Sequence, residues 1–217
     1  VTLANHVGDA DRDAVTAAPS VIAAAETVAV DEAIGLLLLG SIASCEMGDF
    51  EEGAELARRA LVCTELSHEN VARPSALVAL GRSLSRLRQL EDSHAAGREA
   101  LTLLDPSDSG ELSLIGRAHM VIGETRRYES FDDWLEELHL AFDAFTAAAD
   151  FDGAGEAARL GHYILSTSSG PEYDLWSRRA RELTELDDFR GRAWIARAEM
   201  YSELVRGNYD EAWEAAE

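Results

Sequence analysis

The chain has 217 residues, of which 47% are hydrophobic and 7% aromatic, and its formal net charge is −22. A chain of this charge repels nucleic acid and anionic membranes as a whole, which argues against direct nucleic-acid binding. No apolar run approaches the ~20 residues of a membrane span, and no signal peptide is visible, so we expect no membrane association.

Helical periodicity predicts a series of helix pairs. Residues 1–28 are expected to form the second helix of a preceding pair, in which Pro19 either kinks the helix or precedes a new one that starts at Ser20. Ala and Leu dominate the apolar residues and only four prolines interrupt them, which predicts an all-α protein. The later pairs are expected at 31–46 with 50–67, 72–87 with 91–104, 109–127 with 130–149, 152–168 with 172–186, and 190–206 with 209–217.

The pairs repeat with a period of about 40 residues, which is typical of a solenoid. First helices carry a glycine, Gly81 or Gly161, where a partner helix is expected to come close. The turns Gly48-Asp49 and Gly207-Asn208 supply a left-handed helix exit followed by a capping side chain. An alanine recurs in the second helices, as Ala60, Ala100, Ala141 and Ala180.

No segment has the length or composition of an interdomain linker, so residues 1–217 are predicted to form a single domain. Val1 is not a methionine, and Glu217 falls within a helical pattern. The chain is therefore expected to belong to a longer protein, with partial repeats at both ends and about five helix pairs between them.

The repeated residues resemble the tetratricopeptide repeat family. They are Leu77, Leu80, Gly81, Leu84, Leu90, Ala100, Leu101 and Pro106 in one copy, then Gly48, Phe50, Ala60 and Leu61, then Leu160, Gly161 and Ile164, and finally Gly207, Tyr209 and Ala212. The period of about 40 exceeds the family's usual 34. Ser93 replaces an expected alanine and Ile122 an expected small residue. The resemblance implies a right-handed superhelical solenoid of antiparallel helix pairs, like the arrays attached to large bacterial regulators.

In such an array the first helices line a concave groove, and one stripe along them provides candidate binding residues. The stripe carries Arg82, Arg86, His119, Arg126, Arg127, His162, Trp194, Arg197 and Tyr201. Glu46 is the one acid expected there. We predict that the groove binds an acidic or carboxylate-bearing segment, with arginine forks for carboxylates and Trp194 and Tyr201 as apolar anchors. The alternative is that these arginines pair with acids on adjacent helices.

Catalysis and metal binding are only weakly indicated. Three histidines follow a glutamate by three residues, as Glu65 and His68, Glu91 and His94, and Glu136 and His139. A di-iron site needs this spacing and two further glutamates, so we expect no metal and no cofactor. Cys45 and Cys63 are interpreted as packing residues, and Trp134, Trp176 and Trp213 as core residues between pairs. No phosphate-binding loop or hydrolase motif occurs, so an enzyme is not expected.

The predicted function is a non-catalytic module that binds a protein, a peptide or the sister domains of its own chain. The resemblance implies a regulatory or sensor segment of a larger bacterial regulator. Two cysteines make no disulfide framework, which indicates a reducing cytoplasm. The alternative function is a structural array that spaces or dimerises other domains and has no ligand of its own.

Overall fold

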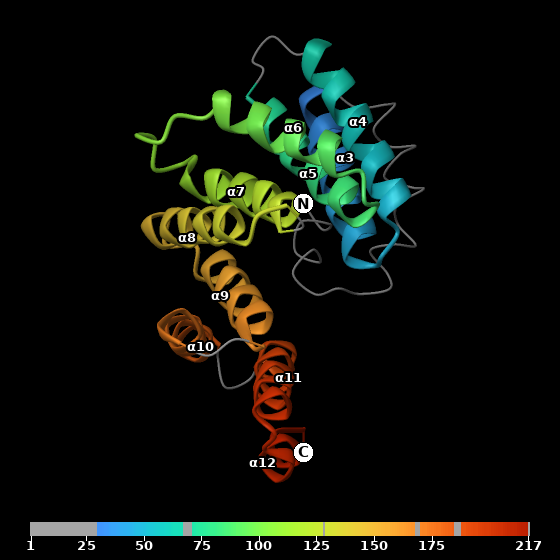
Figure 1. The fold of residues 1–217 in the computed structure, drawn as a ribbon. Helices are drawn as coiled ribbons and strands as arrows, with labels where there is room; N and C mark the ends of the chain where they lie inside the picture. Colours follow the sequence, from blue (N-terminus) through green and yellow to red (C-terminus); the bar gives the residue numbers. More distant parts are fainter. Residues whose placement is uncertain (1–29, 67–70, 128, 168–169, 185–187, 217) are drawn as a thin grey trace.

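The computed structural model describes residues 30–66, 71–127, 129–167, 170–184 and 188–216. The chain is all-helical throughout these residues, without strands (Figure 1). The helices are α3 (Val30–Glu46), α4 (Phe50–Leu66), α5 (Arg73–Arg86), α6 (Leu90–Thr102), α7 (Leu112–Arg126), α8 (Phe131–Ala147), α9 (Phe151–Leu165), α10 (Pro171–Leu183), α11 (Phe189–Arg206) and α12 (Tyr209–Ala216). The ten helices predicted after residue 30 are thus confirmed. The predicted helix at 1–28, with Pro19, lies outside the described residues.

The turns within the pairs show how the chain leaves each first helix. Gly48 and Gly207 lie in the left-handed region, with φ of 84° and 82°. The next backbone N–H then reaches back to the end of the helix, as Asn208 N does to Glu203 O over 2.9 Å. Arg88 and Ala149 adopt the same left-handed conformation between a helix and its successor, with φ of 64° and 54°. The predicted glycine turns are confirmed, and two further turns use the same geometry without glycine.

The helices pack in chain order, and every helix contacts the next one. The first helices of the pairs also contact one another, α3 with α5, α5 with α7, α7 with α9, and α9 with α11. Among the described residues the backbones of the second helices lie farther apart, and α8 and α10 meet through side chains, as Phe142 and Trp176 do with ring centres 5.6 Å apart. The first helices therefore form an inner row, and the second helices lie outside it (Figure 1).

The core consists of local clusters between neighbouring pairs, and glycines determine how closely the helices approach. The ring of Phe145 on α8 lies against Gly116 of α7 and Gly153 of α9. The ring of Trp176 on α10 lies against Gly161 of α9. Both aromatic side chains are fully buried, because the missing glycine side chains leave room for the rings.

The three tryptophans expected in the core differ in their surroundings. Trp134 and Trp176 are buried, as predicted. Trp213 is 69% exposed, and the prediction was wrong for this residue. The reason is that α12 packs only on α11 within the described part of the chain, which leaves most of the Trp213 side chain accessible to solvent. No helix in this part of the chain is both long enough and apolar enough to cross a membrane.

The close approach at Gly161 predicts a stability change. A Cβ at Gly161 would lie 2.6 Å from the Trp176 ring, whereas a Cβ at Gly35 of α3 would have no atom within 4 Å. Gly161→Ala should therefore lower the free energy of unfolding by about 1–3 kcal/mol. Gly35→Ala should raise it by up to about 1 kcal/mol, because alanine favours the helix. Urea unfolding of both variants tests this, and equal effects would contradict the proposed packing.

Candidate binding groove

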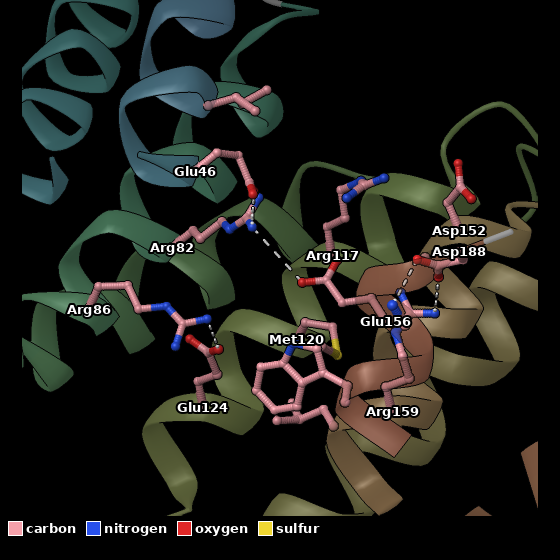
Figure 2. Close-up of a pocket in the computed structure, with 15 residues that line it drawn as sticks. Glu46, Arg82, Arg86, Arg117, Met120, Glu124, Asp152, Glu156, Arg159 and Asp188 are labelled. Atoms are coloured by element: carbon pink, nitrogen blue, oxygen red, sulfur yellow. Dashed lines mark hydrogen bonds and ion pairs between the residues drawn. The ribbon is translucent and has the colours of Figure 1, made fainter. Parts of the chain in front are cut away.

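A groove of about 620 Å³ opens along the inner row of helices. Its apolar lining consists of Ile42, Met120, Leu160 and Trp194, which come from α3, α7, α9 and α11. Its charged lining consists of Glu46, Arg82, Arg86, Arg117, Glu124, Asp152, Glu156, Arg159 and Asp188. Figure 2 shows these charged side chains converging from α3, α5, α7 and α9, with Asp188 at the start of α11. The groove therefore belongs to the first helices, and its surface mixes charges with apolar patches.

Arg82 is the central charge of the groove. Its Nη2 lies 2.5 Å from Glu46 Oε1 and 4.0 Å from Glu156 Oε1, so it joins α3 to α9 (Figure 2). Burial disfavours its charge, but the attraction of Glu156 and Glu46 outweighs burial and raises the pKa of Arg82 above its ordinary value. The guanidinium is therefore fully charged, and the chain's own carboxylates already surround it.

The other groove arginines are paired as well. Arg86 lies 3.1 Å from Glu124, whose carboxylate also accepts a hydrogen bond of 2.7 Å from Ser85. Arg159 lies 3.6 Å from Asp188. The expectation that Glu46 is the one acid of the stripe was wrong, because four further acids line the same groove. They are Glu124, Asp152, Glu156 and Asp188.

Two aspartates each connect a helix start to the arginine of a preceding first helix. Asp150 accepts a 2.9 Å hydrogen bond from Gly153 N at the start of α9, and lies 3.4 Å from Arg117 of α7. Asp188 accepts one of 2.7 Å from Gly191 N at the start of α11. Burial would raise the pKa of Asp150, but hydrogen bonds from Ser113 and the Gly153 N–H lower it below its ordinary value. Both capping carboxylates hold an arginine against the groove wall.

The structure distributes the predicted binding residues over several places. Arg82, Arg86 and Trp194 line the groove. Arg127 is exposed and lines a smaller hollow of about 140 Å³ beside Arg86. Arg126 lies away from the groove lining, 3.3 Å from Glu129.

Both predicted histidines lie between helices. His119 is directed at α8, with Nδ1 2.6 Å from Glu137 Oε2. His162 is fully buried against α10, with Nε2 3.3 Å from the Tyr173 hydroxyl. Neither residue lines the groove. The stripe traced from the sequence therefore follows the groove on α5 and at Trp194 of α11, but leaves it on α7 and α9.

The last two predicted residues, Arg197 and Tyr201, follow Trp194 on α11 and are not among the residues that line the groove. Arg197 lies over the rings of Tyr163 and Tyr201, with its guanidinium carbon 5.2 and 5.8 Å from their centres. Tyr163 of α9 also packs edge-on against Trp194, with ring centres 5.1 Å apart. Tyr163 was missed by sequence reasoning, because it lies one turn beyond the residues that line the groove on α9. We call Tyr163, Trp194, Arg197 and Tyr201 the aromatic shelf.

The residues considered for metal or thiol chemistry have structural contacts. Cys45 Sγ lies 3.1 Å from Ser83 Oγ in the core, where burial raises the pKa of the thiol. His94 lies 3.1 Å from Thr125, and His139 lies 3.3 Å from Glu172. Across the described residues no group of three or more metal-ligating side chains occurs. His68 lies outside these residues.

No protein-family model matches the chain, and no curated protein is significantly similar to it. The resemblance to tetratricopeptide repeats therefore rests on the repeat period, the turns and the glycine positions described above.

The buried His162 predicts a pH dependence of stability. Burial lowers its pKa to about 4, whereas an unfolded histidine has its ordinary value of 6.5. Between these values the unfolded state binds a proton that the folded state does not, so acidification should remove up to about 3 kcal/mol of stability. The loss starts near pH 6.5 and is complete below pH 4. Urea unfolding from pH 7 to 4 should show this slope for the parent chain and for His139→Gln, but not for His162→Gln.

Proposed function

We propose that the chain is a tetratricopeptide-like array, wound as a right-handed superhelix, that binds a protein or peptide segment through its groove without catalysis. Support comes from the inner row of first helices, which is the arrangement that gives helical repeats an extended concave surface. The setting that the resemblance implies is a cytoplasmic regulatory or sensor segment of a larger bacterial regulator. The partner is then a separate protein, a peptide or a sister domain.

The observation that carries this proposal is the groove itself. Its lining spans all five first helices and offers the apolar side chains of Met120, Leu160 and Trp194 between charged groups. Such a surface suits an extended segment that crosses several helices, because apolar anchors contribute affinity and charged groups select the partner. A single compact ligand would not need so long a lining.

The internal ion pairs constrain how an acidic segment binds. Glu46 and Glu156 both lie beside Nη2 of Arg82, so a ligand carboxylate that binds at this nitrogen competes with them. The Glu156 pair is long, at 4.0 Å, and partly exposed, so its loss costs little, in the range of about 0–1 kcal/mol for surface pairs. The exchange is therefore nearly neutral in free energy, and the apolar anchors must supply most of the affinity.

A single bulky substitution can block the groove, and the same substitution outside the groove serves as a matched control. Glu156 on α9 and Glu55 on α4 are both exposed helical glutamates with a distant arginine partner, at 4.0 and 3.8 Å. Glu156 lines the groove and Glu55 does not. Peptides selected from a random phage-displayed library on the intact chain should bind Glu156→Trp at least about tenfold more weakly. Glu55→Trp should leave the affinity unchanged, as measured by fluorescence anisotropy.

The second candidate function is a structural array that self-associates. Exposed apolar side chains at the end of α11 and on α12 favour it, namely Leu204, Val205, Tyr209 and Trp213. In that case the library should yield no groove-dependent peptide. Sedimentation velocity should instead show a dimer that Tyr209→Glu dissociates, and such a dimer together with the absence of a groove-dependent peptide would contradict the peptide-binding proposal.

A further inference from the structure

The exposed side of α11 carries a row of residues that differs from the rest of the groove. Trp194 is 40% and Tyr201 36% exposed, and Arg197 lies between them. The neighbouring acids point elsewhere, since Glu199 binds Arg181 over 2.5 Å and Glu203 binds Arg206 over 2.8 Å. The chain has 41 acidic and 19 basic residues, yet Arg197 forms no ion pair with an acid among the described residues.

Arg197 differs from the groove arginines in what its guanidinium contacts. Arg82, Arg86 and Arg159 each have a carboxylate within ion-pair distance. Arg197 has only the faces of Tyr163 and Tyr201, and no carboxylate partner among the described residues. Stacking on a ring leaves the edge of the planar guanidinium, which carries the N–H donors, open for a further acceptor.

The aromatic shelf is also held in place before any ligand arrives. Tyr163 contacts Trp194 and Tyr201 edge-on, with ring centres 5.1 and 6.1 Å apart. Three rings from two helices thereby fix the position of Arg197. A ligand that binds here loses little entropy to ordering of the protein, which favours recognition by these few residues.

We propose that the aromatic shelf binds a linear peptide segment in which a carboxylate side chain lies next to a bulky apolar one. The carboxylate accepts paired N–H bonds from Arg197, and the apolar side chain packs on Trp194 or Tyr201. This inference rests on the proposed function, because Trp194 belongs both to the groove lining and to the aromatic shelf, so the two sites adjoin. The proposal assigns recognition of the carboxylate to Arg197, whose N–H donors are open, rather than to Arg82.

The charges of the aromatic shelf and of the whole chain favour a peptide over other ligands that bind aromatic rings. A nucleic-acid strand needs a run of cations, but the shelf has a single arginine in a chain of net charge −22. A quaternary ammonium group needs an empty aromatic cage, but Arg197 already lies over two of the three rings.

The test uses the full chain and defined peptides. A fluorescein-labelled 12-residue peptide with two Glu-Phe pairs in a Gly-Ser background is compared with versions that carry Gln for Glu or Ser for Phe. Binding is measured by anisotropy, and the indole N–H signal of Trp194 is followed by NMR. The Glu-Phe peptide should bind most tightly and shift this signal, and each altered peptide should bind at least about tenfold more weakly.

Variants of α11 separate the shelf from the groove. Arg197→Gln should weaken binding of the Glu-Phe peptide about tenfold or more, and Arg197→Lys should restore part of it because the charge returns. Arg192→Gln, an exposed arginine on the same helix but outside the shelf, is the matched control and should bind normally. Circular dichroism of each variant checks that the helices are intact.

The possible failures are distinguishable. In one case, Glu156→Trp weakens the binding of library peptides and Arg197→Gln does not. This result overturns the shelf inference and leaves the proposed function standing. A dT12 oligonucleotide that binds more tightly than the Glu-Phe peptide would also overturn the inference, as would a dimer that buries Trp194. If no library peptide binds at all, both proposals are wrong.

Discussion

The structure depends on large side chains that occupy the space left by glycines on neighbouring helices. Phe145 contacts Gly116 and Gly153 at once, so one ring sets the spacing of α7, α8 and α9. Because protein interiors are close-packed, this spacing has little freedom to change. It also brings the start of α9 beside α7, where Asp150 meets Arg117. The wall of the groove is therefore a consequence of the core packing directly behind it, where the guanidinium of Arg117 lies 5.7 Å from the centre of the Phe145 ring.

Electrostatics then divides the groove into two regions of different character. Around Arg82 the arginines form ion pairs with the chain's own acids. An acidic ligand in this region therefore competes with those carboxylates for the arginines. At the aromatic shelf the single arginine is matched by ring faces alone. In a chain of net charge −22, long-range forces repel an acidic partner, and short-range contacts must select it.

Much of the fold could be predicted from the sequence, because helix periodicity and glycine positions are local signals. Gly81 and Gly161 lie where a partner helix comes close, as expected, Gly81 against α6 and α7 and Gly161 against α10. The residue after each glycine shows where this reasoning fails. Arg82 is long enough to reach sideways into the groove, whereas the shorter His162 remains between α9 and α10 beneath Tyr173. Small residues occur on several sides of α9, so its apolar pattern does not show which side faces the groove. Glu156 could therefore not be identified as a groove residue from the sequence.

The two ends of the exposed row on α11 need not serve the same purpose. Trp194 lies at the groove, whereas Val205 lies eleven residues later, about 16 Å along the helix, beside the exposed side chains of α12. A second copy of the chain that covered Val205 and Trp213 would therefore leave the donors of Arg197 accessible. Self-association at the α12 end and peptide binding at the shelf are compatible on one helix. Binding of a ligand to the N–H donors of Arg197, rather than the oligomeric state, distinguishes a binding module from a structural spacer.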